Sequence, residues 1–333
     1  MKLAVIGAGM SGVIAANAVK NEYGGSIDVT VFEKSRGAGG RMSTRRTEEF
    51  EFDHGAQYFT AKHPQFDKMI AAAVDAGQVA PWTGKALYLK DGKTEADTGG
   101  ARFAAVPRMN SWIKSMAQGL TVQTSQRVSA LSREDGRWTL KFESGETAGG
   151  FDYVVSSIPA PQAHALLSPI GFTGAALLQE SVKMQACFAV MAGFSSQMTL
   201  PWVSLRSPDG PASWIALNSA KPGRKQGQSA VIIHAGPNWS DAHTEAPKDE
   251  VQSLMLSEAS RLSEIDFARA DYLTIHRWLY ASVLSGAEQP CLADPALGIV
   301  ACGDWCLGGR VEGAYLSASA AAKQIIGWIN HSV

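Results

Sequence analysis

The chain has few cysteines, no excess of charge of one sign and no long apolar run, and each shortage excludes a class of protein. Four cysteines in 333 residues are too few for a disulfide framework, and we interpret them as reduced thiols of a cytoplasmic protein. The 30 basic and 31 acidic residues nearly cancel and form no blocks, which argues against a nucleic-acid partner. No apolar stretch reaches the about 20 residues that span a bilayer, so we expect no membrane segment.

The spacing of the cysteines also speaks against a metal site. Cys302 and Cys306 form the closest pair, with three residues between them, whereas zinc-binding and redox motifs use a two-residue spacing. We therefore predict no metal ion.

Glycine, in contrast, is abundant, and its positions near the start of the chain predict a βαβ unit. The 33 glycines include three within the first twelve residues. We expect a buried strand over Lys2–Ile6, a helix over about Ser11–Tyr23 and a second strand over Asp28–Glu33. At 45% hydrophobic residues, the chain is long enough for about two globular domains.

The glycines between the first strand and the helix form a G-x-G-x-x-G motif at Gly7, Gly9 and Gly12. The first permits a tight turn, the second lets a pyrophosphate approach the backbone, and the third lets helix and strand pack closely. Amides at the start of the helix, including those of Met10 and Ser11, then face the phosphates. A glycine-rich turn in any α/β protein can imitate this motif, but Glu33 lies where a ribose-binding acid is needed.

The G-x-G-x-x-G motif alone does not separate FAD from NAD, but the residues after Glu33 do. They resemble the flavin-containing amine oxidase superfamily, in which an acid, a spacer and G-G-R contact FAD. Here the predicted contacts beyond Glu33 are Lys34, Arg36, Gly40, Arg41 and Met42. Arginine suits this role because its planar fork can hold a phosphate through two hydrogen bonds. The alternative is a solvated basic loop.

A second candidate half of the site lies near the end of the chain. An apolar strand over Leu297–Cys302 leads into Gly303-Asp304, and Glu312-Gly313-Ala314 opens a long helix. In FAD enzymes with this pattern the aspartate binds the ribityl chain. The helix N-terminus faces the flavin edge that becomes negative on reduction. The alternative is a strand, turn and helix used only for packing.

Several stretches in this order and spacing resemble the renalase family, particularly its bacterial members. They are residues 34–42, 53–60, 157–163, 276–280, 302–306 and 309–314. The resemblance implies a non-covalently bound FAD, with further contacts from Gly55, Ala56, Gln57 and Val128. It also implies oxidation of 1,2- or 1,6-dihydro-NAD(P) to NAD(P)⁺, with dioxygen as the final acceptor and hydrogen peroxide as product.

Two other functions stay open at this point. The chain could be an amine oxidase acting on a small amine, which would share every FAD motif, or an interaction protein that holds FAD as a structural ligand. Hydride transfer from a dihydropyridine needs close stacking and exclusion of water more than a positioned base. The aromatic residues of the middle segment, with no evident acid–base pair, favour hydride transfer.

Five residues are candidates for the substrate side of the reaction: Gln57, Tyr58, His234, Trp278 and Tyr280. Gln57 and Tyr58 follow the D-H-G stretch and would lie near the flavin. His276 and Trp278 share one face of a predicted strand, because alternate side chains point the same way. For Tyr58, His234 and Trp278 the alternative is an ordinary place in the core.

These observations together predict an α/β chain with a p-hydroxybenzoate-hydroxylase-like two-domain fold. Residues 1–72, 103–160 and 288–333 would form a discontinuous Rossmann-type FAD-binding domain. Residues 73–102 and 161–287 would form an inserted substrate domain built on a mostly antiparallel sheet. The sequence leaves the oligomeric state open.

Overall fold

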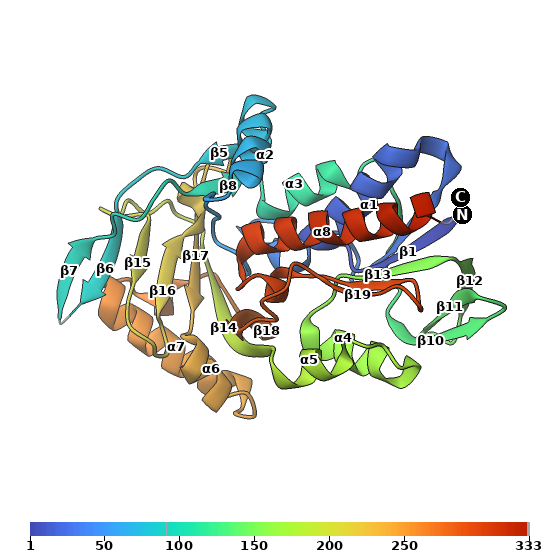
Figure 1. Ribbon diagram of the computed structural model, residues 1–333. Coiled ribbons are helices and arrows are strands. Elements are labelled where there is room, and N and C mark those ends of the chain that lie inside the picture. Colours follow the sequence, from blue (N-terminus) through green and yellow to red (C-terminus); the bar gives the residue numbers. More distant parts are fainter. Residues whose placement is uncertain (91, 332–333) are drawn as a thin grey trace. The chain divides into compact units, whose positions relative to one another are not determined.

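A computed structural model describes residues 1–90 and 92–331. The chain forms two compact units, coloured by sequence in Figure 1. The first unit comprises residues 1–40, 113–184 and 283–333, and the second comprises residues 41–112 and 185–282. Each unit is therefore assembled from segments that are far apart in the sequence.

A six-stranded sheet forms the centre of the first unit. Its strand order is β19 (Leu292–Asp294), β20 (Ile299–Ala301), β13 (Tyr153–Ser156), β1 (Lys2–Ile6), β2 (Asp28–Phe32) and β9 (Thr121–Gln123). The strands from β20 to β9 pair in parallel, whereas β19 runs antiparallel at the edge. The inner strands are continuous apolar runs, as expected for a parallel sheet that is covered on both faces.

Helices cover the two faces of this sheet (Figure 1). Helices α1 (Met10–Tyr23) and α8 (Arg310–His331) pack along one face, where small side chains allow close approach. The other face packs against α4 (Ala160–Leu167), α5 (Ala175–Glu180) and an antiparallel meander. The meander consists of β10 (Val128–Glu134), β11 (Arg137–Phe142) and β12 (Thr147–Phe151). The predicted Asp135-Gly136 hairpin turn joins β10 to β11, and both residues have positive φ, at 47° and 76°.

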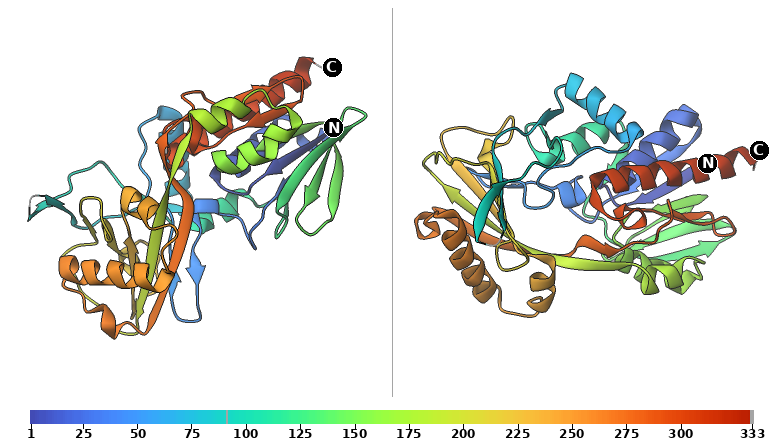
Figure 2. Two further views of the ribbon diagram at one scale, coloured as in Figure 1. Left: turned by 90° about the horizontal axis from the view of Figure 1, so that it is seen from below. Right: turned by 60° about the vertical axis from the view of Figure 1, so that its left-hand side comes forward.

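The second unit is built on a seven-stranded sheet. Its strand order is β18 (Tyr272–Ser285), β14 (Lys183–Phe194), β17 (Ser229–His234), β16 (Trp214–Leu217), β15 (Ser204–Arg206), β6 (Ala86–Lys90) and β7 (Lys93–Ala96). Figure 2 shows the long strands β14 and β18 side by side. Strands β15 and β6 pair in parallel, and the pairs from β14 to β15 and from β6 to β7 are antiparallel. The unit also contains α2 (Pro64–Asp75), α6 (Pro237–Ala242), α7 (Lys248–Ser263), β3 (Arg45–Arg46), β4 (Glu51–Phe52), β5 (Val79–Pro81) and β8 (Phe103–Ala105), and α3 (Met109–Met116) starts in it.

The two faces of the seven-stranded sheet differ in chemistry. Residues in register on neighbouring strands point to the same face. One register row is apolar and belongs to a core cluster that includes α7: Leu87, Leu205, Ile215 and Ile233. The next row is polar and aromatic: Tyr88, Arg206, Trp214 and His234. We call the side of the sheet that carries this second row the polar face.

The predicted fold class is confirmed, because a Rossmann-type sheet and a mostly antiparallel sheet are both present. The strands and helix of the opening βαβ unit lie within one residue of their predicted bounds. Two long segments group differently from the predicted domains: residues 41–72 belong to the second unit, and residues 161–184 belong to the first. The apolar side chains of α4 explain the second difference, since Ala163, Leu166 and Leu167 pack into the core beneath the parallel sheet. Two short segments also differ, since residues 103–112 belong to the second unit and residues 283–287 to the first. The two units are defined by their compactness, whereas the predicted domains were defined by cofactor and substrate binding. The predicted domain bounds therefore stay a prediction. Within the described residues, no helix is long and apolar enough to cross a bilayer.

Candidate functional site

The motifs singled out in the sequence meet at one edge of the parallel sheet. Gly7 follows β1, Glu33 follows β2, Ser157 follows β13, and Cys302-Gly303 follows β20. All four strands are parallel, so these segments lie at their shared carboxyl ends. In open α/β sheets this edge is where nucleotides bind, beside the point at which the strand order reverses.

The glycines at this edge form a backbone cradle that side chains would fill. Gly7 has a φ of +103°, and a Cβ on Gly12 would lie 1.9 Å from the carbonyl oxygen of Gly7. Gly40 has a φ of +53°, and a Cβ there would lie 3.1 Å from the Cα of Gly9. The first and second glycine-rich turns therefore touch through bare backbone. This arrangement fits a dinucleotide, whose phosphates need close access to backbone amides.

Glu33 is only 5% exposed and both of its carboxylate oxygens accept backbone hydrogen bonds. The Ala8 amide donates to Oε2 and the Ser35 amide donates to Oε1, each at 2.8 Å. These contacts fix the carboxylate beside the first glycine turn. A carboxylate has about four acceptor positions, so acceptor capacity remains for the two hydroxyls of a ribose.

The two ends of the chain meet at the N-termini of α1 and α8. The Ser11 hydroxyl donates to the Ala314 carbonyl at 2.9 Å, and the Gly303 amide donates to the Ser317 hydroxyl at 3.0 Å. Asp304 is buried in a short 3₁₀ turn, and Gly308, Gly309 and Arg310 with positive φ lead from it into α8. The predicted ribityl ligand and the predicted ring-facing helix N-terminus therefore lie in the same unit as Gly7 and Glu33.

The other predicted cofactor contacts differ in burial, and they are divided between the two units. Met10 and Met42 are buried, Glu312 and Val128 are half-buried, and Lys34 and Arg36 are exposed. In the second unit, the Ala56 amide donates to the Arg41 carbonyl at 2.9 Å. A Cβ on Gly55 would lie 2.0 Å from that carbonyl oxygen. Segments 41–42 and 55–56 thus lie against each other, but their contact with a cofactor stays a prediction.

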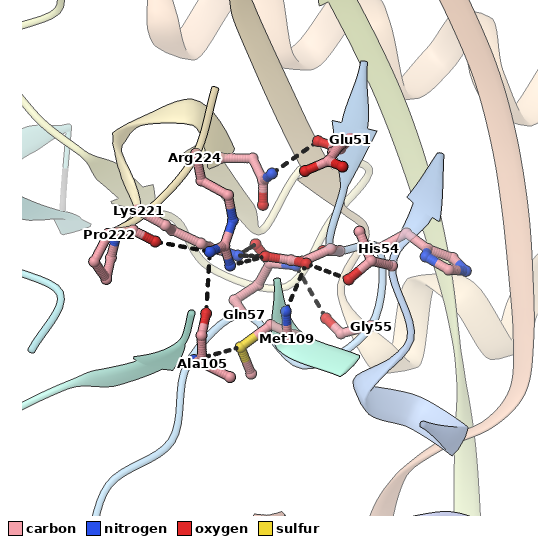
Figure 3. A network of polar contacts seen from close by, with 12 residues as sticks. Glu51, His54, Gly55, Gln57, Ala105, Met109, Lys221, Pro222 and Arg224 are labelled. Carbon is pink, nitrogen blue, oxygen red and sulfur yellow. Dashed lines mark hydrogen bonds and ion pairs between the residues drawn. The ribbon is translucent and has the colours of Figure 1, made fainter. Parts of the chain in front are cut away.

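A buried ionic network, which the sequence did not reveal, surrounds Asp53. Figure 3 shows its members Lys221, Arg224 and Gln57. Its fully buried carboxylate pairs with Arg224 at 2.6 Å and with Lys221 at 3.3 Å, and accepts from the Thr44 hydroxyl at 2.6 Å and the Met109 amide at 3.1 Å. Burial alone would raise the pKa of Asp53, but the two cations and the hydrogen bonds lower it to about 2. Burial, with repulsion from Arg224, lowers the pKa of Lys221 to about 8, although Asp53 acts in the opposite direction.

Gln57 belongs to this network rather than standing free. Its Oε1 accepts from the Lys221 ammonium at 3.1 Å, and its Nε2 donates to the carbonyls of Asp53 and Gly55. The ion pairs therefore hold the turn from Asp53 to Gln57, the same stretch that the sequence singled out. The side-chain amide is engaged within the protein, so we expect Gln57 to act by positioning this turn.

The carbonyl of His54 brings two of the predicted substrate residues together. It accepts hydrogen bonds from His234 Nε2 at 3.1 Å and from Trp278 Nε1 at 3.0 Å. The ring of Trp278 stacks on His54 with centroids 5.1 Å apart and contacts His276 at 4.5 Å. Tyr280 is half-buried two residues further along the same strand. Burial lowers the pKa of His54 to about 3 and the pKa values of His234 and His276 to about 4. All three imidazoles are therefore neutral at pH 7.

This cluster predicts a loss of stability in mild acid. An unfolded histidine titrates near 6.5, and these three titrate lower when folded, so between about pH 6.5 and 4 the unfolded chain binds more protons. The free energy of unfolding should fall as pH is lowered through this window. Denaturant titrations at several pH values measure the slope, and His234→Gln, which keeps a donor for the His54 carbonyl, should reduce it. An unchanged slope would contradict this assignment.

The remaining predicted residue, Tyr58, lies in an aromatic group on the polar face. Its ring centroid is 5.6 Å from that of Trp214 and 6.3 Å from that of Trp82. The Arg102 guanidinium lies over the Tyr58 ring at 4.9 Å. Among the described residues, no group of three or more His, Cys, Asp or Glu side chains could hold a metal ion.

Comparison with known proteins agrees with this geometry. Residues 84–326 match the family of flavin-containing amine oxidoreductases, and residues 5–73 match an NAD(P)-binding Rossmann-like domain. Renalase of Mus musculus is 25% identical over 308 residues, which cover 86% of this chain and 87% of renalase.

Two solved structures share the fold at low identity. A cyclohexylamine oxidase from Brevibacterium oxydans has a TM-score of 0.76 at 14% identity, with 99% of each chain covered. A protein from Exiguobacterium described as a protoporphyrinogen oxidase has a TM-score of 0.75 at 15% identity, covering 100% of this chain and 99% of its own. At these identities the likeness extends to the fold alone.

Proposed function

The chain belongs to the family of flavin-containing amine oxidoreductases, and within that family we propose that it oxidises isomeric dihydro-NAD(P), in the 1,2- or 1,6-form, to NAD(P)⁺. Its cofactor is FAD, as the family match and the renalase relative imply. Bound FAD supplies the hydride acceptor at N5 and passes the electrons to dioxygen, which leaves as hydrogen peroxide. The similarity to renalase over most of both chains supports this choice of substrate.

The polar face of the second unit is the observation that carries the proposal. Aromatic rings and neutral imidazoles line it, and hydride loss from a dihydropyridine requires flat, dry walls rather than a base. The product is a cationic pyridinium ring, and aromatic walls stabilise such a ring. In this unit the buried carboxylate of Asp53 is already paired with Arg224, and the half-buried carboxylate of Asp97 is already paired with Arg102.

An amine substrate fits this face less well. A small amine is protonated at pH 7, so it needs a carboxylate or an open aromatic surface. The Arg102 guanidinium already lies over the rings of Tyr58 and Trp214, at 4.9 and 5.8 Å. An ammonium group would therefore have to share this aromatic surface with the guanidinium. Amine oxidation is therefore the second candidate, supported by the family name and by the shared fold.

Anaerobic mixing of the FAD-loaded protein with each substrate class tests the proposal. We expect 1,2- or 1,6-dihydronicotinamide dinucleotides to bleach the flavin at least about 100-fold faster than primary amines, because only they fit the aromatic face. Air should then restore the oxidised spectrum with formation of hydrogen peroxide. Rapid bleaching by amines, with dihydronicotinamides inert, would overturn the proposal. A flavin that neither class reduces would instead support a structural role for FAD.

We also propose that FAD is held without a covalent bond. A thiol must become a thiolate to attack the flavin, and burial raises the pKa of Cys187 and Cys306 to about 12 and that of Cys291 to about 11. Cys302 is fully buried, and its pKa is raised as well. FAD should accordingly be released intact when the protein is denatured.

A further inference from the structure

One end of the polar face carries a compact group of aromatic side chains and an arginine. We call it the indole cluster: Tyr58, Trp82, Arg102 and Trp214, all in the second unit. The rings of Trp82 and Trp214 lie 6.4 Å apart, and each contacts Tyr58. Trp82 is 5% exposed and Trp214 is 9% exposed. Both indoles are therefore more than nine-tenths buried.

Both indole N–H groups in this cluster lack a hydrogen-bond partner among the described residues. Three other indoles of the chain each donate to a backbone carbonyl, Trp138 at 2.8 Å, Trp278 at 3.0 Å and Trp305 at 3.1 Å. A buried donor without an acceptor is costly and rare in folded proteins. Two such donors in one cluster, on the polar face, indicate that a ligand supplies the acceptor.

The charged groups around the indole cluster indicate which kind of acceptor fits the two donors. Arg102 pairs with Asp97 at 2.6 Å and donates to the Ser204 hydroxyl at 3.2 Å, so its positive charge is already balanced. The free groups are then two neutral donors between flat rings. The Lys221 ammonium lies 5.4 Å from the centre of the Trp82 ring, but it is paired with Asp53. A carbonyl oxygen on a planar ring fits two donors between flat rings better than a tetrahedral phosphate does, and better than an ammonium group, which has no acceptor.

A cavity of about 320 Å³ lies next to the cluster in the same sheet. Tyr88, Asp97 and Arg206 line it, and Asp97 is also the partner of Arg102. Arg206 is in register with both Tyr88 and Trp214 on the neighbouring strands. The Arg102–Asp97 pair therefore borders both the cavity and the indole cluster.

We propose that the indole N–H groups of Trp82 and Trp214 bind the carboxamide oxygen of the nicotinamide ring and so select substrates that carry this group. The inference rests on the proposed function, because it names the part of that substrate which the polar face recognises. The hydrogen bonds replace those that the carboxamide makes with water. No covalent step is involved.

Calorimetric titration of the FAD-loaded protein with oxidised ligands tests this subsite without turnover. The variants are Trp82→Phe and Trp214→Phe, which keep an aromatic ring and remove the N–H. Each should weaken binding of NAD⁺ and nicotinamide mononucleotide by about 3- to 10-fold, the effect of one lost hydrogen bond, and leave ADP-ribose binding unchanged. Trp202→Phe is the matched control, since Trp202 is equally buried but lies in the core cluster that contains α7. It should bind all three ligands like the unsubstituted protein.

Each outcome bears on one of the two proposals. Equal affinity of all variants for the nicotinamide ligands would overturn the subsite, as would a loss of ADP-ribose binding, which would assign the donors to phosphate oxygen. If Trp202→Phe weakens binding of the nicotinamide ligands as much as the two cluster variants do, the effect comes from lost packing, and the subsite is overturned as well. If the unsubstituted protein binds NAD⁺ and the two variants do not, yet dihydronicotinamides leave the flavin oxidised, the proposed reaction fails and the subsite stands.

Discussion

Replacing Asp53 by alanine is expected to destabilise the second unit by about 3–5 kcal/mol, the cost of leaving buried cations without their partner. The carboxylate is fully buried and is the ionic partner of both Lys221 and Arg224. Without it, two positive charges remain side by side in a region that water does not reach. A loss of this size should lower the thermal unfolding midpoint by roughly 10 °C or more in a unit of this size.

The exposed pair of Glu258 and Arg261 provides the control. Its atoms are 2.7 Å apart, nearly the same distance as between Asp53 and Arg224, but the arginine side chain is 65% exposed. Glu258→Ala should therefore change stability by no more than about 1 kcal/mol. If Asp53→Ala lowers the free energy of unfolding no more than Glu258→Ala does, the buried network does not stabilise the second unit.

The pH dependence of this contribution follows from the pKa of Asp53. The folded value is lowered from 3.8 to about 2, so the stabilisation is fully present above about pH 4 and is lost as pH falls through about 2. This window lies below that of the histidines around His54. The two effects can therefore be separated in one acid titration of the unfolding free energy.

The sequence predicted the nucleotide side of the fold well because its signals are local. Gly7, Gly9 and Gly12 lie within six residues, and the strand that ends at Phe32 places Glu33 beside them. Each of these residues is explained by a turn, a helix start or a strand end, and such features depend on near neighbours. The strand over residues 297–302 and the final helix were predictable for the same reason.

The substrate side depends on contacts between distant residues, which a single sequence does not display. Asp53 meets Lys221 and Arg224 across 168 and 171 residues, and the stretch that contains both cations resembles an ordinary loop. Trp82 was not among the candidates, because only its packing against Tyr58 and Trp214 brings it to the polar face. His234 and Trp278 were both candidates from the sequence, but the carbonyl of His54 that joins them is not visible in the sequence.

Substituting Gly12 by alanine is expected to abolish stable FAD binding, with affinity reduced at least about 100-fold. The added Cβ would lie 1.9 Å from the Gly7 carbonyl oxygen and 2.6 Å from the Ser157 hydroxyl. Rotation of the new methyl group does not move its carbon atom and so relieves neither contact. The first turn of α1 must therefore move away from β1. Because we expect the phosphates to bind through the backbone amides of that turn, a shift of even about 1 Å should remove several hydrogen bonds at once. The flavin content of the purified protein and the affinity of the apoprotein for added FAD measure the effect.

Gly25→Ala separates this effect from a general cost of removing glycine, since a Cβ there meets no atom within 4 Å and should leave FAD binding unchanged.

Glu33→Gln tests the same cradle by a different route. It keeps the size of the side chain, but its amide nitrogen only donates, so one of the Ala8 and Ser35 amides loses its acceptor. We expect it to weaken FAD binding by about 10-fold or more, the effect of a lost charge-assisted hydrogen bond. Normal flavin content in both Gly12→Ala and Glu33→Gln would mean that this edge of the parallel sheet does not hold the nucleotide.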